Sequence, residues 1–143
     1  MSATPGASDD GPSPVLPPRR TLGPRRLVRS FGYAFAGLAY LLWREPNARI
    51  HAGAVLLVCL LAAWLGLDAA EWALLASLCG LVIGLEAMNT AVEGLADLVQ
   101  PARDPRVRHL KDVAAGGVLA AALAAAVGGC FLFGPRLWRL LGG

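Results

Sequence analysis

The sequence contains few charged and few aromatic residues for a chain of 143. Charged residues make up 16% and aromatic residues 7%, whereas 56% are hydrophobic. A soluble domain has about 25% charged residues, so this composition argues against a soluble protein. The three cysteines, Cys59, Cys79 and Cys130, show no paired spacing. This favours small buried hydrophobic side chains over a metal or redox site.

The nucleotide-binding signatures of soluble enzymes are also absent. No G-x-x-x-x-G-K-[ST] sequence occurs, because the Gly32 to Gly37 segment is not followed by a lysine. Neither H-R-D nor D-F-G is present. The P-loop and soluble protein-kinase classes are therefore excluded.

Three long stretches, residues 52–67, 72–85 and 113–133, carry no charge. About 20 mostly apolar residues cross a bilayer, and three successive stretches of this kind favour membrane spans over a soluble core. The expected spans cover about residues 49–67, 69–99 and 109–133. Pro101 is expected to stop the second span, and Gly134-Pro135 the third. Small residues, among them Gly128 and the Gly80-Gly84 pair, predict close contacts between helices.

The N-terminal part of the chain has a different pattern. Residues 1–24 hold six of the ten prolines and are expected to form a disordered cytoplasmic tail, ahead of one membrane domain at 25–143. Apolar residues at three- and four-residue steps predict an amphipathic helix at about 25–45, lying in the membrane interface. A fourth span is the alternative, but its uncharged part, 31–43, is too short to cross alone. Pro46 is expected to end this helix.

The basic residues predict the orientation. Seven arginines lie at or before position 49 and four bases between 103 and 111, whereas the connector around 67–71 has none. An excess of Lys and Arg marks cytoplasmic segments. We therefore expect a multi-pass protein of the inner (cytoplasmic) membrane, with the N-terminus cytoplasmic and the C-terminus outside, where Arg136 and Arg139 break the rule. The net charge of +3 reflects this topology and attraction to anionic lipid headgroups rather than nucleic-acid binding.

Four polar residues interrupt the second expected span: Glu86, Asn89, Glu93 and Asp97. Their spacing of 3, 4 and 4 places them within about 80° of arc on one helix face. A charge at mid-bilayer costs about 2.5–3.5 kcal/mol, so a carboxylate there indicates function. The helical rise places Glu93 near the inner interface and Glu86 about 10 Å deeper.

Further polar residues, Glu45, Lys111 and Asp112, are expected at the same side of the membrane. Neighbouring carboxylates provide oxygen ligands, which favour Mg²⁺ over zinc. The deeper Glu86 suits a general base. A structural role, in which the stripe pairs with arginines across a bundle, is the alternative, and it has equal weight for Asp97 and Asp112.

The segment Glu86-Ala-Met-Asn89-Thr-Ala-Val-Glu93-x-x-x-Asp97 resembles the prokaryotic diacylglycerol kinase family of small membrane kinases. Three further segments share this resemblance: Gly32-Tyr33-x-x-x-Gly37, Glu45-x-Asn47-x-Arg49-Ile50-His51 and Lys111-Asp112-Val113-Ala114-Ala115-Gly116. Together they cover about residues 26–134. The second of these segments looks closer to the branch that includes undecaprenol kinases. The connector at 101–108 shows no clear match, and no contact is inferred from it.

The resemblance implies ATP-dependent phosphorylation of a lipid alcohol by a homotrimeric helical bundle with sites shared between neighbours. It implies an all-α membrane protein, with one interfacial helix and three transmembrane helices in each chain. Diacylglycerol is the expected substrate, within phospholipid metabolism, and undecaprenol is the alternative. A non-catalytic helical membrane subunit is the alternative of another class. The implied roles are Glu86 as catalytic base, Glu45 and Glu93 as Mg²⁺ ligands, Asp97 as a supporting residue, and Arg26, Tyr33, Asn89, Lys111 and Asp112 as nucleotide ligands.

Overall fold

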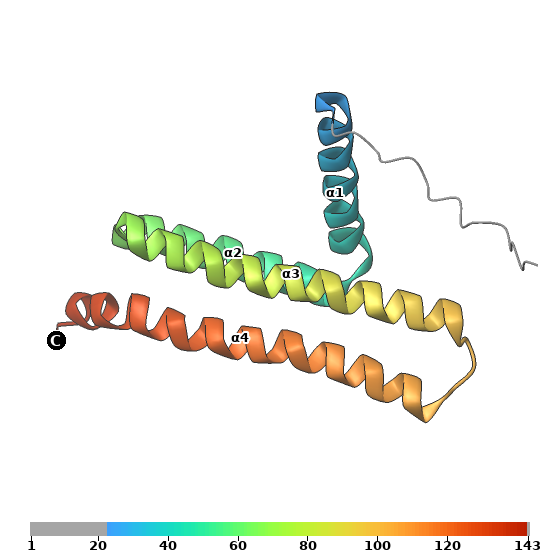
Figure 1. Ribbon diagram of the computed structural model, residues 1–143. Helices are drawn as coiled ribbons and strands as arrows, with labels where there is room; N and C mark the ends of the chain where they lie inside the picture. Colours follow the sequence, from blue (N-terminus) through green and yellow to red (C-terminus); the bar gives the residue numbers. More distant parts are fainter. Residues whose placement is uncertain (1–22, 143) are drawn as a thin grey trace, which may run out of the picture.

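The computed structural model describes residues 23–142, and these fold into four helices with no strand among them. The helices are α1 (Pro24–Arg44), α2 (Pro46–Leu65), α3 (Ala69–Val99) and α4 (Pro105–Leu140) (Figure 1). The expected all-α architecture with three long apolar helices is confirmed. The disordered tail expected at 1–24 falls outside the described residues except for Gly23, which caps α1, and Pro24, which belongs to α1.

A single residue, Glu45, separates α1 from α2. Its backbone is extended, with φ −102° and ψ 116°, which is the conformation favoured before a proline. Pro46 then occupies the first turn of α2, where its missing N–H has no helical partner to lose. The break expected at Pro46 is confirmed, and α2 starts there. At its other end Gly66 adopts φ 65°, the left-handed conformation that terminates helices at glycine.

A capping box starts α3. The Asp68 carboxylate accepts a hydrogen bond from the Glu71 N–H, and the Glu71 carboxylate accepts one from the Asp68 N–H, both at 2.9 Å. These bonds satisfy two N–H groups that a helix start leaves open. The helix then continues to Val99, and its bounds agree with those expected from the sequence.

The last helix, α4, is longer than expected. It begins at Pro105 and continues through Pro135 to Leu140 instead of ending at the Gly134-Pro135 pair. The expectation that this pair stops the helix was wrong. Two arginines beyond Pro135 support the end of α4. The Arg136 guanidinium donates a hydrogen bond to the Leu132 carbonyl, and the Arg139 guanidinium donates one to the Pro135 carbonyl, both at 3.2 Å.

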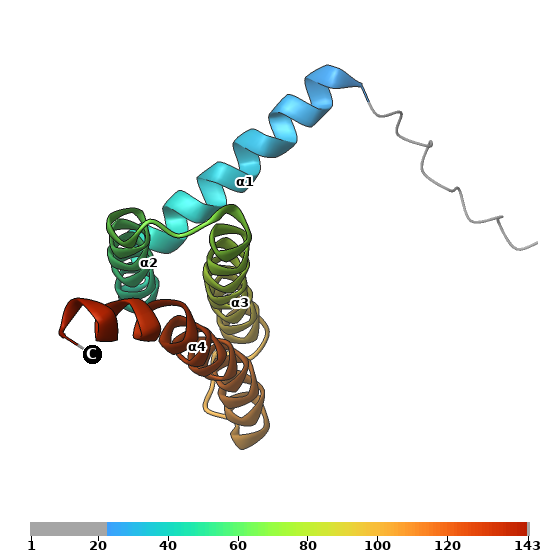
Figure 2. The same cartoon turned by 90° about the vertical axis from the view of Figure 1, so that its left-hand side faces the viewer.

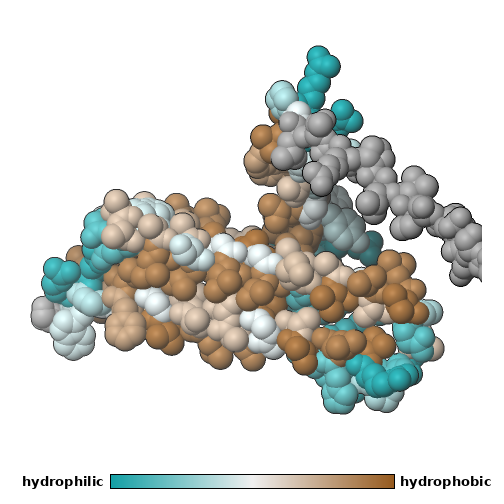
Figure 3. Space-filling view, in the orientation of Figure 1, coloured by the Kyte–Doolittle hydropathy of each residue, from teal (hydrophilic) through white to brown (hydrophobic). Residues whose placement is uncertain are grey.

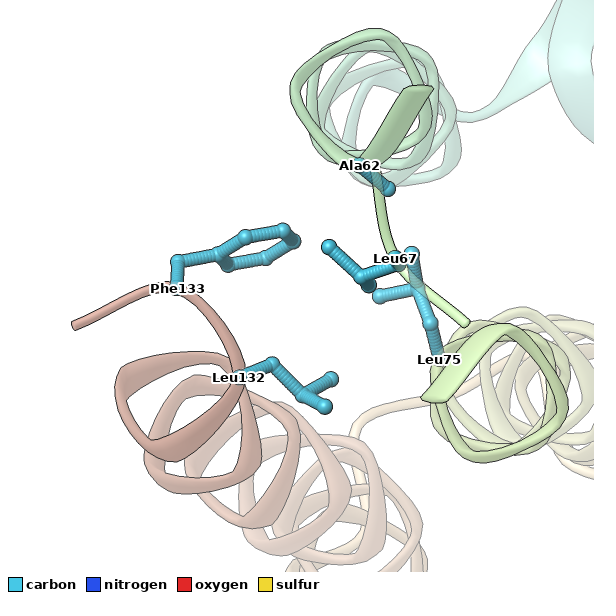
Figure 4. Packing of buried hydrophobic residues seen from close by; sticks show 5 residues of the cluster. All are labelled: Ala62, Leu67, Leu75, Leu132 and Phe133. Atoms are coloured by element: carbon cyan, nitrogen blue, oxygen red, sulfur yellow. The ribbon is translucent and has the colours of Figure 1, made fainter. Parts of the chain in front are cut away.

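Helices α2, α3 and α4 form the bundle. Seen end-on, they occupy three corners, whereas α1 runs away from them (Figure 2). The end of the bundle near the α2–α3 connector holds a cluster in which side chains from all three helices and the connector meet (Figure 4). Its buried members are Ala62, Leu67, Leu75, Leu132 and Phe133.

These three helices are each long and apolar enough to cross a membrane. The space-filling view shows a mainly hydrophobic band along the bundle, with hydrophilic residues at its two ends (Figure 3). The protein is therefore a multi-pass membrane protein. The placement of α1 in the interface stays a prediction.

One glycine of α4 makes room for a side chain of α3. A Cβ atom at Gly128 would lie 2.6 Å from Cδ1 of Leu78, so the absence of a side chain permits this contact. The contact expected at Gly80 and Gly84 does not occur within one chain, because both are exposed and a Cβ there would meet nothing within 4 Å.

Candidate active site

The inward face of α3 carries an unusual pair of polar residues. Leu75, Val82, Glu86 and Asn89 are its buried positions, and their spacing of seven, four and three residues places them on one face. Glu86 is 3% exposed and Asn89 is 8% exposed. In the described part of the chain, these are the two polar or charged residues that are buried. Because a buried carboxylate is costly, its position in the bundle indicates function.

Asn89 connects this buried face to Glu93. Its Nδ2 donates a hydrogen bond of 3.0 Å to Oε1 of Glu93. Its Oδ1 is buried and has no hydrogen-bond partner. Between residues 23 and 142, every other buried side-chain nitrogen or oxygen has one. Leaving a buried acceptor unpaired costs about 1–3 kcal/mol. The free Oδ1 is therefore suited to accept a hydrogen bond from a bound ligand.

Both expected metal ligands line one groove. This groove of about 920 Å³ lies between α1 and α3, and Glu45, Glu93 and Asp97 are its acidic residues. No group of three potential metal-binding side chains is gathered closely enough to hold an ion among residues 23–142. Mg²⁺ is commonly held by only one or two carboxylates plus substrate phosphates. Glu45 and Glu93 fit this kind of site, because both carboxylates line the same groove.

A second groove, of about 530 Å³, lies where α3 passes into α4. Lys111 and Asp97 both line it, and the Lys111 Nζ donates a hydrogen bond to Oδ1 of Asp97. Asp97 therefore belongs to both grooves. Since a lysine ammonium is a suitable partner for phosphate, this ion pair places a positive charge beside the groove that holds Glu45 and Glu93.

The connector contributes a residue that sequence reasoning did not select. Asp104 lines the second groove and caps α4, and its Oδ1 accepts a 2.8 Å hydrogen bond from the Arg106 N–H. The Arg106 guanidinium, together with this N–H, holds the pKa of the Asp104 carboxyl below its usual value. The Asp-Pro sequence at the start of a helix was the signal that could have identified it.

Three of the expected nucleotide ligands do not join this site within one chain. Asp112 is exposed, lines neither groove, and lies 4.0 Å from Arg108. Tyr33 is 73% exposed, and neither it nor Arg26 lines a groove with Glu45 and Glu93. Both lie on the N-terminal half of α1, which projects away from the bundle (Figures 1 and 2).

Comparison with known proteins identifies the family. The sequence pattern of the family described as prokaryotic diacylglycerol kinase matches residues 32–133. The diacylglycerol kinase of Synechocystis sp. is 43% identical over 113 residues, covering 78% of this chain and 65% of that protein. The undecaprenol kinase of Bacillus subtilis is 32% identical over 112 residues, covering 78% and 91%. The diacylglycerol kinase of Escherichia coli is 32% identical over 122 residues, covering 85% and 97%.

The matched segment contains every candidate site residue except Arg26. The match spans slightly less than two thirds of the Synechocystis protein and nearly all of the other two. With most of the chain covered by the family pattern, the chain belongs to the prokaryotic diacylglycerol kinase family.

Proposed function

We propose that this chain, a lipid kinase by its family, transfers the γ-phosphate of ATP to the hydroxyl of diacylglycerol and makes phosphatidic acid. One observation carries the proposal: Glu45 and Glu93 line one groove, and Glu86 is buried on the same helix as Glu93. Glu93 is seven positions after Glu86, which is about 10 Å along the helix. A phosphate donor at the groove and a lipid hydroxyl deeper in the membrane can meet between Glu93 and Glu86.

The groove suits the phosphates of MgATP. Glu45 and Glu93 would hold Mg²⁺, which neutralises charge on the transferring phosphoryl group when it is bound. The Asn89 amide orients Glu93 through its 3.0 Å hydrogen bond. Its free Oδ1 accepts a hydrogen bond from the nucleotide. Lys111, positioned by Asp97, presents its ammonium to the phosphates.

Glu86 acts as the base in this proposal. Its carboxylate takes the proton of the lipid hydroxyl, and the lipid oxygen forms a bond to the γ-phosphorus of ATP. The bond between that phosphorus and the β–γ bridging oxygen breaks, and ADP leaves. Phosphoryl transfer depends mainly on positioning and charge neutralisation. The carboxylates of the groove would hold Mg²⁺, which together with Lys111 would supply the neutralising positive charge.

The assembly we propose is a homotrimer in which neighbouring chains complete each site. Arg26 and Tyr33 lie on α1 apart from the groove that Glu45 and Glu93 line, so a nucleotide contact from them requires a neighbour or a movement of α1. Asp112 lies on α4 and lines neither groove, so a contact from it would come at a site shared with a neighbour. The exposed Gly80 and Gly84 offer a face on α3 where another helix can approach closely.

The orientation we propose has the N-terminus in the cytoplasm and the C-terminus outside the inner membrane. The bases between residues 103 and 111 then face the cytoplasm, together with both grooves. ATP is cytoplasmic, so this orientation brings the phosphate donor to Glu45, Glu93 and Lys111.

Undecaprenol is the second candidate substrate, because the relative from Bacillus subtilis is named an undecaprenol kinase. The Asn47-x-Arg49-Ile50-His51 segment supports the same alternative. The family match does not favour a non-catalytic membrane subunit, the alternative of another class.

The test supplies the purified protein in mixed micelles with Mg²⁺ and ATP labelled on its γ-phosphate. Diacylglycerol and undecaprenol are offered in parallel. Label in phosphatidic acid is the expected result. Label only in undecaprenyl phosphate would make undecaprenol the substrate and leave the proposed phosphoryl transfer unchanged. Label in neither lipid, from a well-folded oligomer, would contradict the proposed activity.

A further inference from the structure

A third groove, of about 520 Å³, lies where the last turns of α2 and α4 meet. Trp64 and Leu65 line it from α2, and Arg136, Arg139 and Leu140 line it from α4. Seen end-on, the last turns of α4 lie beside α2 (Figure 2). This groove is therefore at the opposite end of the bundle from the two grooves of the candidate active site (Figure 1).

The groove depends on the continuation of α4 through Pro135. Arg136 and Arg139 are three positions apart, so one face of the helix carries both toward α2. The family pattern ends its match at residue 133, and both arginines lie beyond it. They also lie far from Glu86 and the acidic groove, so the proposed phosphoryl transfer does not account for them.

The two guanidinium groups of this groove differ in their partners. Glu71 forms an ion pair with Arg136 and neutralises its charge. Arg139 donates from Nε to the Pro135 carbonyl, and its Nη1 and Nη2 have no hydrogen-bond partner within residues 23–142. No acidic residue is among those that line the groove in the described structure. The groove therefore carries one positive charge that the fold does not compensate.

The other residues of the groove suit the boundary between lipid headgroups and hydrocarbon. Trp64 lies one position before the end of α2, and tryptophan is enriched at this level because its ring is apolar and its indole N–H is polar. Leu65 and Leu140 add apolar surface beside it. Hydrophilic residues gather at this end of the hydrophobic band (Figure 3). A cation, an indole donor and apolar walls thus meet at one membrane surface.

We propose that this groove binds the phosphate group of an anionic phospholipid in the leaflet at the α2–α3 connector end of the bundle. The guanidinium of Arg139 receives the phosphate, because its planar fork of N–H donors matches two phosphate oxygens at once. The indole of Trp64 supplies a further N–H donor from the opposite wall. The acyl chains of the lipid follow the apolar surface of the helices into the membrane.

The composition of the groove favours this occupant over two others. A zwitterionic headgroup carries an ammonium as well as a phosphate, and no carboxylate lines the groove to receive that ammonium. A free phosphate ion has no apolar part, so it leaves Trp64, Leu65 and Leu140 without a partner. A headgroup of net charge −1 with hydrocarbon attached matches both the uncompensated cation and the apolar walls.

The first test compares two lipids that differ only in the headgroup. Native mass spectrometry of the full chain in an uncharged detergent measures binding of phosphatidylglycerol and of phosphatidylcholine with the same acyl chains. The wild type should bind phosphatidylglycerol at least about fivefold more tightly, since one basic residue near a membrane surface contributes about this much. Equal affinities for the two lipids would overturn the proposal.

Two arginine variants show whether this preference comes from the groove. Arg139→Gln should reduce the preference for phosphatidylglycerol to less than about twofold. Arg29→Gln is the matched control, because it removes the same charge from an exposed position on α1 that does not line the groove, and it should keep the wild-type preference. A wild-type preference in Arg139→Gln, or an equal loss in both variants, would overturn the proposal.

Two tryptophans at this end of the bundle provide a second matched pair. Trp64 is 70% exposed and lines the groove, whereas Trp138 is 71% exposed and does not. Trp64→Ala should weaken phosphatidylglycerol binding by about threefold, which corresponds to the loss of one hydrogen bond. Trp138→Ala should stay within about twofold of the wild type. Equal losses in the two variants would assign the binding to the membrane surface in general and contradict a site in the groove.

Two further measurements use the wild-type protein and so do not depend on the folding of a variant. Inorganic phosphate in hundredfold excess should leave phosphatidylglycerol bound, and its displacement would overturn the choice of a lipid as the occupant. A phosphatidylglycerol analogue with a photoreactive headgroup should label the last turns of α2 and α4. Label confined to the other basic segments, α1 and residues 103–111, would overturn the location. Because these measurements use neither ATP nor a lipid alcohol, their outcome is independent of the proposed kinase activity.

Discussion

The side chains of Arg136 and Glu71 form a two-pronged ion pair between the end of α4 and the start of α3. Nη1 of Arg136 lies 2.7 Å from Oε1 of Glu71, and Nη2 lies 2.7 Å from Oε2. The two side chains are only 23% and 24% exposed. In the proposed orientation Arg136 would lie outside, against the positive-inside rule. The ion pair accounts for this exception, because Glu71 neutralises the charge of Arg136 within the fold.

Glu71→Gln should lower the thermal unfolding midpoint in detergent by several degrees. The substitution keeps the capping box, since glutamine also caps a helix start, but it leaves the guanidinium of Arg136 without its carboxylate. Thermal unfolding followed by circular dichroism measures the effect. Arg139→Gln is the matched control, because Arg139 donates only to a backbone carbonyl and has no ion pair in the described structure. A Glu71→Gln midpoint equal to that of the wild type would show that the pair adds no stability.

The stability that Asp104 contributes should be lost in acid. The side chain and N–H of Arg106 lower its pKa in the folded state, so its charged form contributes stability above the ordinary pKa of an aspartate, which is about 3.9. That contribution disappears as the pH falls through the lower folded pKa. Asp104→Asn keeps a good helix cap but removes the charge.

The unfolding midpoint of Asp104→Asn should therefore lie below that of the wild type at pH 7, and the two should converge below about pH 4. Midpoints measured across this range provide the check. A difference that stays constant with pH would assign the effect to helix capping rather than to charge.

The helices could be predicted from the sequence where local signals determine them. Pro46 favours an extended conformation at Glu45 and so separates α1 from α2. The length of α3 follows from its apolar pattern and from Pro101. The end of α4 could not be predicted in this way. The helix continues through Pro135 with an arginine just beyond it that is held by Glu71, a residue 65 positions away in the sequence.

The same distinction applies to the candidate site. The spacing of Glu86, Asn89 and Glu93 is a local helical property, and the structure does place the first two on a buried face. The pairing of Lys111 with Asp97 depends on how the connector closes, which no spacing encodes. The direction in which α1 leaves the bundle is also non-local, so the sequence alone could not show that Tyr33 lies away from the groove.

Glu93→Gln should raise the Mg²⁺ concentration required for half-maximal lipid phosphorylation by at least about tenfold. The amide can still accept the hydrogen bond from Asn89, so the change removes a charged oxygen ligand and little else. A Mg²⁺ titration at saturating ATP measures it. Asp68→Asn, at the opposite end of α3, removes a carboxylate far from the groove and should leave the titration unchanged. An unchanged titration for Glu93→Gln would exclude this residue from the metal site.

Glu86→Gln should assemble normally and lose phosphorylation activity by at least about 100-fold, the usual contribution of a general base. Glutamine keeps the size and hydrogen-bonding capacity of the side chain, and removing a buried charge is not expected to destabilise the bundle. Size-exclusion chromatography and the unfolding midpoint test the assembly, and the labelled-ATP assay tests the activity. Activity within a few-fold of the wild type would exclude Glu86 as the base. Failure to assemble would instead assign the carboxylate a structural role, because its charge would then be required by the bundle itself.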